Sequence, residues 1–222
     1  AYNNLGVTFE TQGKSKEAMN FFDQALSIDA NYAQAHLNKG NSLQKEGKSK
    51  EALTSFKRAL SIKPNYAEAL NNMGAVLQSQ GKLEDSILAY NKALRIKPNY
   101  WEAYFNIGRA RNEQGYLSKA IKAYTKAISF KHDSAAAHRD LSFIKKFTEH
   151  DPQIQLLEKL IAKPITPESE KCQYLYSLGK AYEDLGRFES AFNQYQLGGK
   201  LRKKQLSYNI KEDEVLFKKI KK

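Results

Sequence analysis

The apolar and small positions of this chain repeat with a fixed period of 34 residues. Each unit contains a glycine in its first part, and this column holds Gly6, Gly40, Gly74 and Gly108. A second glycine follows seven residues later, at Gly13, Gly47, Gly81 and Gly115. Later columns hold small residues at Ala18, Ala52, Ser86 and Ala120, and aromatic residues at Phe22, Phe56, Tyr90 and Tyr124. So many matched columns at one period indicate tandem structural repeats.

Each column has a physical reason if one unit is a pair of antiparallel helices. The first glycine and the small residues let two helices approach closely, and the second glycine ends the first helix in a left-handed conformation. The aromatic column is expected to fill the gap between successive pairs. Pro64 and Pro98 follow the second helix, because proline cannot continue it. One pair is too short to bury its apolar face alone, so the sequence predicts an all-α solenoid of stacked pairs.

The unit NYAEALNNMGAVLQSQGKLEDSILAYNKALRIKPNY, residues 65–100, resembles the tetratricopeptide repeat (TPR) almost position for position. The resemblance implies a right-handed superhelix in which the first helix of every pair lines a concave groove. Four regular units cover residues 1–134. A fifth begins at Ala135 but is degenerate, because Ser142 replaces the column glycine and Lys145 replaces an apolar residue.

The pattern of the remaining chain is less regular. We expect a degenerate repeat with an irregular helical linker at 135–170, a further TPR unit at 171–200, and a basic C-terminal helix at 201–222. Within these segments, residues 151–163 are predicted to form an irregular helix, and Gly198-Gly199 is predicted to end a helix. The last helix is expected to lead to a missing downstream domain.

A narrower resemblance concerns this C-terminal part. The sequence HDPQIQLLEKLI, residues 150–161, and the stretch from Tyr174 to Ile220 are similar to the region that joins TPR arrays to the catalytic domain of bacterial TPR-sulfotransferases. In that family the following domain binds the sulfate donor PAPS through a P-x-S-G-T-T loop, and no such motif is present in these 222 residues. The resemblance implies that the chain is the non-catalytic docking half of a sulfotransferase, with PAPS bound in the downstream domain.

Rows of matching residues on the first helices give the candidate binding site. One row stands two residues before each column glycine and contains Asn4, Asn38, Asn72 and Asn106. An asparagine side chain can pair with both the carbonyl and the N–H of an extended peptide, and the TPR array of O-linked N-acetylglucosamine transferase has a similar asparagine row. Neighbouring positions complete the predicted peptide-binding groove with Asn71, Phe105, Arg109, Gln44 and Gln78.

Other interpretations of the same residues stay open. Asparagine is common in this TPR column, where it can serve local helix hydrogen bonding instead of a ligand. The carboxylate clamp of chaperone-binding TPR domains needs lysines, where this chain has Asn3, Leu37, Asn71 and Phe105. Two alternatives to the sulfotransferase context are a free-standing TPR adaptor and the TPR arm of an O-linked glycosyltransferase. In each case the expected partner is a protein or an extended peptide, and possible contacts include the chain's own downstream catalytic domain.

Composition and charge narrow the function classes. The net charge of +12 is concentrated towards residues 200–222 and raises encounter rates with anions, but no nucleic-acid reader motif accompanies it, so nucleic acid is not an expected partner. A basic run of this kind is more often a solvated helix face. No run of residues is apolar enough to span a membrane, and the single Cys172 fits a reducing compartment. We therefore expect a cytoplasmic protein.

Catalytic and metal-binding patterns are missing from the sequence. The four histidines form no H-E-x-x-H pair, and one cysteine cannot build a zinc site. No Gly-Lys pair has the spacing of a nucleotide-binding phosphate loop. The sequence therefore predicts a non-enzymatic chain with no cofactor or metal of its own, and interprets its histidines as structural.

Overall fold

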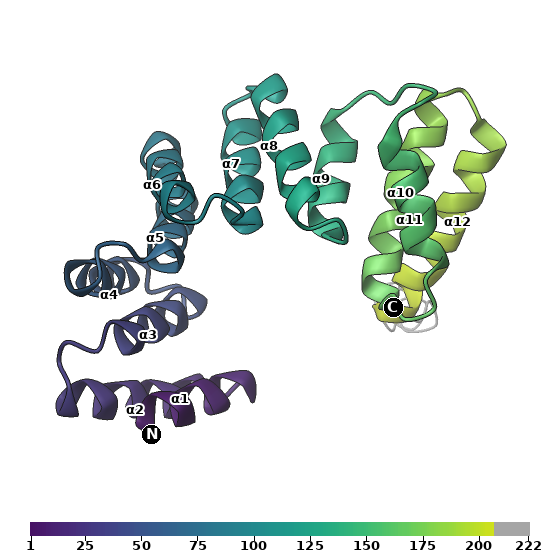
Figure 1. Ribbon diagram of the computed structural model, residues 1–222. Coiled ribbons are helices and arrows are strands. Elements are labelled where there is room, and N and C mark those ends of the chain that lie inside the picture. Colours follow the sequence, from purple (N-terminus) through teal and green to yellow (C-terminus); the bar gives the residue numbers. More distant parts are fainter. Residues whose placement is uncertain (207–222) are drawn as a thin grey trace, which may run out of the picture. The chain divides into compact units, whose positions relative to one another are not determined.

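The computed structural model describes residues 1–206, which contain twelve α-helices and no strand (Figure 1). The chain divides into two compact units, Ala1–Phe130 (unit 1) and Lys131–Lys222 (unit 2). The prediction of an all-α fold of paired helices is confirmed.

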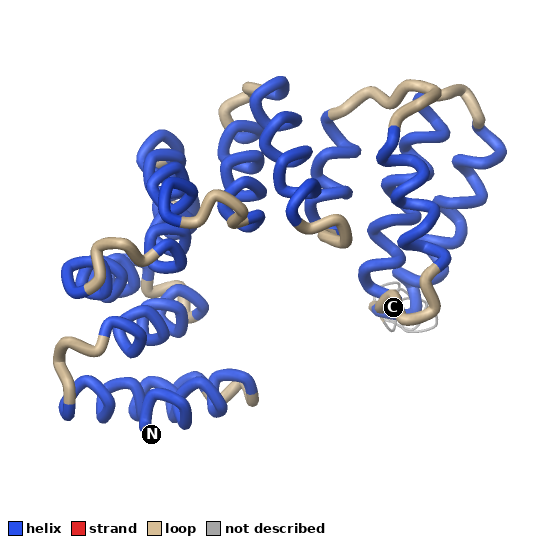
Figure 2. Tube along the Cα trace, viewed as in Figure 1, coloured by secondary structure: helices blue, strands red, loops and turns tan. Residues whose placement is uncertain are grey.

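Unit 1 is a stack of four helix pairs (Figure 2). Within each pair the two helices pack against each other, and the second helix also packs against the first helix of the next pair. The helices are α1 (Tyr2–Thr11), α2 (Ser15–Ile28), α3 (Ala33–Lys45), α4 (Ser49–Ile62), α5 (Ala67–Ser79), α6 (Leu83–Ile96), α7 (Trp101–Glu113) and α8 (Leu117–Phe130).

The turn within each pair is built on the predicted left-handed glycine. Gly47 has a φ of 76°, and its N–H donates to the carbonyl of Gln44 at 3.0 Å, while the N–H of Lys48 donates to the carbonyl of Leu43 at 2.9 Å. These two bonds satisfy carbonyls that the end of α3 would otherwise leave without partners. The equivalent glycines of the other pairs have the same φ sign, at Gly13, Gly81 and Gly115.

The column glycine is required by the aromatic ring of its own helix pair. A Cβ atom on Gly40 would lie 2.5 Å from the ring of Phe56, and one on Gly108 would lie 2.5 Å from the ring of Tyr124. The expected place of these rings, between successive pairs, is only part of their packing, because each ring also covers the glycine within its own pair. Phe56 also belongs to a buried cluster with Val76 of the next pair, so the ring contributes to both kinds of packing.

Unit 2 departs from this regular pairing. Its α11 packs against α9, α10 and α12, so three helices share one central neighbour. The described helices of the unit are α9 (Ala135–Ile144), α10 (Pro152–Ala162), α11 (Glu168–Asp184) and α12 (Phe188–Gln205).

Three expectations for unit 2 need correction. The helix within 151–163 is a regular α-helix, because the Asp151 side chain accepts the Gln153 N–H at its N-terminus and Pro152 occupies the first turn. Gly198-Gly199 does not end a helix but lies inside α12, where a Cβ on Gly198 would meet the Tyr176 ring at 3.2 Å. Residues 201–205 continue α12 instead of starting a new helix, and residues 207–222, the rest of the predicted basic helix, lie outside the described residues.

A buried polar cluster occupies the core of unit 2. His138 is fully buried, and its Nε2 donates to the carbonyl of His132 at 2.8 Å, while its Nδ1 accepts from Gln153 at 3.1 Å. The hydroxyl of Ser142 donates to the carbonyl of His138 at 2.7 Å. Burial lowers the pKa of His138. The histidine therefore serves structure, as the sequence suggested.

Candidate functional site: a polar groove on the first helices

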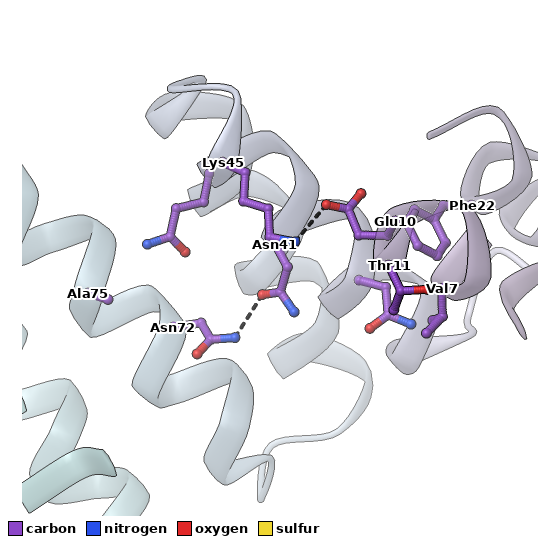
Figure 3. Close-up of a pocket in the computed structure, with 10 residues that line it drawn as sticks. Val7, Glu10, Thr11, Phe22, Asn41, Lys45, Asn72 and Ala75 are labelled. Atoms are coloured by element: carbon purple, nitrogen blue, oxygen red, sulfur yellow. Dashed lines mark hydrogen bonds and ion pairs between the residues drawn. The ribbon is translucent and has the colours of Figure 1, made fainter. Parts of the chain in front are cut away.

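The first helices of three successive pairs in unit 1 enclose a pocket of about 580 Å³ (Figure 3). Residues of α1, α3 and α5 form its wall, with the ring of Phe22 behind them. The lining residues are Val7, Glu10, Thr11, Phe22, Asn38, Asn41, Gln44, Lys45, Asn72 and Ala75.

The pocket contains part of the predicted groove. Asn38, Asn72 and Gln44 line it, as expected of residues on the first helices. The other predicted residues lie outside the pocket, with Asn4 at its exposed position on α1 and Asn71, Gln78, Phe105, Asn106 and Arg109 on α5 and α7.

The asparagine row is tied together by hydrogen bonds between neighbouring repeats. Asn38 donates through Nδ2 to Oδ1 of Asn3 at 2.8 Å, and Asn106 donates in the same way to Asn71 at 3.0 Å. Asn72 instead donates to Oδ1 of Asn41 at 2.7 Å, as the dashed line in Figure 3 shows. The amides therefore link one repeat to the previous one.

The different partner of Asn72 follows from a substitution in the second repeat. The residue before each row asparagine is Asn3, Leu37, Asn71 and Phe105, and Leu37 cannot accept a hydrogen bond. Asn72 therefore bonds to the residue one turn further along α3, Asn41, whose counterparts in the flanking repeats are Val7 and Ala75. Asn41 was missed at the sequence level because it breaks its own column.

The row keeps unused hydrogen-bonding capacity. A primary amide offers two donors and an acceptor with two lone pairs. Asn72 uses one donor towards Asn41 and accepts from Nδ2 of Asn71 at 3.2 Å. Asn38 uses one donor towards Asn3 and accepts from Gln34 at 3.2 Å. Binding a ligand and bonding between repeats are therefore compatible roles for the same side chain.

Two predicted groove residues have mainly structural partners. Gln78 is buried, accepts from the hydroxyl of Tyr90 at 3.0 Å and donates to Glu113 at 2.5 Å. Asn71 is also buried and bridges Asn72 and Asn106. Burial and hydrogen bonding on this scale leave these two side chains little surface for a ligand.

The remaining predicted residues lie on α7 in the fourth repeat. Phe105 is half-buried and packs beside Tyr124, with ring centroids 5.8 Å apart. Arg109 is exposed and forms no ion pair with another residue of the described range 1–206.

An acidic side chain in the pocket is neutralised by its neighbours. Glu10 accepts a hydrogen bond from Lys45 at 2.7 Å, drawn as a dashed line in Figure 3. It accepts a second one from the hydroxyl of Ser42, also at 2.7 Å. Burial would raise the pKa of Glu10, but the bonds from Lys45 and Ser42 outweigh it and lower that pKa. The pocket therefore presents amides, apolar groups and one internal ion pair.

Comparison with known proteins establishes the family. Family models described as tetratricopeptide repeat match residues 1–32, 31–99, 102–133 and 173–203, which together exceed half of the chain. This chain belongs to the tetratricopeptide repeat family. No curated protein matches it.

Solved structures share the fold at low sequence identity. PilF of Pseudomonas aeruginosa is 19% identical, with a TM-score of 0.65 and coverage of 98% of this chain and 96% of that one. MamA of Desulfovibrio magneticus RS-1 is 18% identical, with a TM-score of 0.58 and coverage of 92% and 94%. YrrB, described as a TPR protein with an unusual peptide-binding site, is 19% identical, with a TM-score of 0.55 and coverage of 88% and 90%. At these identities the likeness shows the fold alone.

In the part of the chain that the structure describes, residues 1–206, no three His, Cys, Asp or Glu side chains gather closely enough to hold a metal ion. None of its helices is long and apolar enough to cross a membrane.

Proposed function

We propose that unit 1 binds an extended segment of a partner protein in the groove of its first helices. The observation that carries this proposal is the pocket of about 580 Å³, whose wall displays side-chain amides with unused donors and acceptors. Amides recognise the main chain of a peptide without needing a particular side chain. TPR proteins bind peptides or proteins, so the family supports this class of partner.

The expected affinity is modest. A net hydrogen bond contributes about 1 kcal/mol, and ordering a flexible peptide offsets part of the total. Three or four such bonds together with apolar contacts to Val7 and Ala75 correspond to a dissociation constant of roughly micromolar or weaker. Binding of this strength suits a docking region whose partners exchange.

The first experiment tests the groove with a defined probe. Random dodecapeptides displayed on phage are selected on the purified chain, and the selected sequences are synthesised with a fluorescein label. Fluorescence anisotropy then measures their dissociation constants for the wild type and for N38A/N72A/N106A. We expect micromolar or weaker binding by the wild type and a loss of at least about tenfold in the triple variant.

A matched variant separates binding from folding. Asn20 and Asn91 are exposed on α2 and α6, outside the pocket, so N20A/N91A removes the same chemical group elsewhere. It should bind as the wild type does, and melting temperatures of all variants are compared because the row asparagines also link repeats. Unchanged affinity in a folded N38A/N72A/N106A would sink the groove proposal.

The proposal extends to a larger parent protein. The resemblance of residues 150–161 and 174–220 to the segment that precedes sulfotransferase domains supports a docking role for a PAPS-dependent enzyme. In that setting PAPS binds the following domain, and the groove presents the acceptor protein. A free-standing adaptor, or the arm of an O-linked glycosyltransferase, would use the same groove.

Transfer of labelled sulfate distinguishes these settings. The full-length parent is incubated with PAPS carrying ³⁵S and with proteins fused to the selected dodecapeptides. Peptide-dependent labelling by the full-length protein, and none by this chain, is the expected result. Absence of sulfate transfer by a folded full-length protein would leave the adaptor and the glycosyltransferase arm.

A further inference from the structure

The side-chain amides of unit 1 form two hydrogen-bonded relays, and within each relay every amide donates to the next one. In the first, Gln34 donates to Asn38, Asn38 to Asn3, and Asn3 to Asn4, at 3.2, 2.8 and 3.5 Å. In the second, Asn106 donates to Asn71, Asn71 to Asn72, and Asn72 to Asn41, at 3.0, 3.2 and 2.7 Å. Hydrogen bonds in such a series polarise one another in the same direction.

Each relay ends on an amide with both donors unused. Asn4 and Asn41 accept through Oδ1, and their Nδ2 groups donate to no other residue in the described part of the chain. Asn4 is exposed at the edge of α1, whereas Asn41 is half-buried and lines the pocket (Figure 3). The terminal donors of the second relay therefore lie at the pocket wall.

The surroundings of Asn41 indicate what it would bind. Val7 and Ala75 occupy the same column in the flanking repeats and also line the pocket, so Asn41 lies between two apolar positions. Gln44 follows three residues later on α3, on the same helix face, and its amide bonds to no residue within 1–206. The nearby Glu10 and Lys45 satisfy each other. Two amides with unused N–H donors, next to apolar positions, match a main-chain carbonyl with uncharged neighbours.

We propose that Asn41, which lies outside the asparagine row, is the residue that reads the ligand. Its Nδ2 donates to a main-chain carbonyl of an extended peptide whose apolar side chains contact Val7 and Ala75. The row asparagines then act chiefly as the relay that holds and polarises Asn41. This inference rests on the proposed peptide-binding function, and it assigns that function to a particular donor.

The decisive variant changes the donor and keeps the relay. In Asn41→Asp, an oxygen still accepts from Asn72, but the carboxylate has no N–H to donate. With the selected fluorescein dodecapeptides as probe, we expect binding at least about tenfold weaker and an unchanged melting temperature. Asn20→Asp, at an exposed position outside the pocket, makes the same chemical change and should bind as the wild type does. Wild-type affinity in Asn41→Asp would overturn the assignment.

A second measurement removes the effect of the added charge. Each peptide amide is replaced in turn by an ester, which weakens the carbonyl as an acceptor, and every ester peptide is measured against the wild type and Asn41→Ala. At one ester position in the peptide, the affinity of the wild type should fall about fivefold or more, while the affinity of Asn41→Ala should fall little further. Additive losses at every position would contradict a bond from Asn41. If no dodecapeptide binds the wild type, the failure belongs to the groove function itself.

Discussion

The two units use the polar side chains of this row in opposite ways. In unit 1, amides recur at equivalent positions and bond between repeats, with unused donors remaining at the groove. In unit 2, the row position is Asp140, paired with Arg139 at 2.7 Å, and then Ser177, whose hydroxyl donates to the carbonyl of Gln173 at 3.0 Å. Strict repetition builds a continuous surface, and where it breaks the polar groups satisfy one another locally.

The same contrast applies to the column glycine. Gly108 lies against Tyr124, which is 1% exposed, whereas Gly179 lies against Tyr195, which is half-buried. Between these two positions of the column, Ser142 of unit 2 replaces the glycine, and its hydroxyl donates to the carbonyl of His138 in its own helix. The aromatic ring of the regular unit, Tyr124, is therefore more tightly confined than Tyr195 of the irregular unit.

The largest expected difference comes from adding a methyl group at these two glycines. A Cβ at Gly108 would meet the confined Tyr124 ring at 2.5 Å, so Gly108→Ala should lower the free energy of unfolding by about 1–3 kcal/mol. The Tyr195 ring can move towards solvent, and alanine is favoured over glycine in a helix by about 1 kcal/mol, so Gly179→Ala should be near neutral.

Urea unfolding followed by circular dichroism measures both variants. Gly13→Ala serves as a control for backbone strain without crowding, because no atom lies within 4 Å of its added Cβ while its φ is 75°. Equal losses in Gly108→Ala and Gly179→Ala would show that ring confinement does not distinguish the units.

Lowering the pH should destabilise unit 2 more than unit 1, with a smaller difference than the glycine substitutions give. Burial lowers the pKa of His138 below its ordinary 6.5, so the unfolded state binds a proton before the folded state does. The stability that His138 contributes is present above about pH 6.5 and is lost as pH falls below it, by at most about 1.4 kcal/mol per pH unit. In unit 1, Glu10 has a lowered pKa, so its contribution is lost only as pH falls below about 4.5.

Hydrogen exchange at pH 7 and pH 5.5, corrected for intrinsic rates, measures this difference segment by segment. Protection should fall in α9 and α10 and remain in α1 and α3. His138→Gln should remove the pH effect, and His36→Gln, at the equivalent position of the second repeat, should not. A uniform loss of protection in both units would contradict the assignment to His138.

The smallest expected effect comes from changing the hydrogen-bond acceptor of Asn72 in the second repeat. Asn41→Val leaves the Asn72 donor without an acceptor, whereas L37N/N41V recreates the Asn–Val arrangement of the first repeat, Asn3 and Val7. Leu37→Asn alone loses apolar burial, since Leu37 is 4% exposed. The double variant should be more stable than the sum of the single changes predicts, by about 1 kcal/mol.

A thermodynamic cycle of urea unfolding for the wild type, the two single variants and the double variant gives this coupling. If the changes in the free energy of unfolding add within about 0.3 kcal/mol, the hydrogen bond of Asn72 does not move to the asparagine introduced at position 37. Peptide binding should stay weak in L37N/N41V even when stability is recovered, because the donor of Asn41 is absent.

Much of the architecture was determined by the sequence itself. Single columns already showed what the local backbone needs. Gly47 takes a positive φ, and Gly40 leaves room for the ring of Phe56. Both recur at a period of 34 residues, and repetition turned weak local signals into a fold. The asparagine row and its location on the first helices were predictable for the same reason.

The hydrogen-bond partners were decided only by the tertiary structure. Whether Asn72 bonds to position 37 or to Asn41 depends on two side chains that meet across a helix interface, and no column records it. The extension of α12 past Gly198 and the burial of His138 likewise depend on which helix α11 packs against. A periodic sequence specifies what every repeat shares, whereas contacts between unlike residues of different helices form only when the chain is folded.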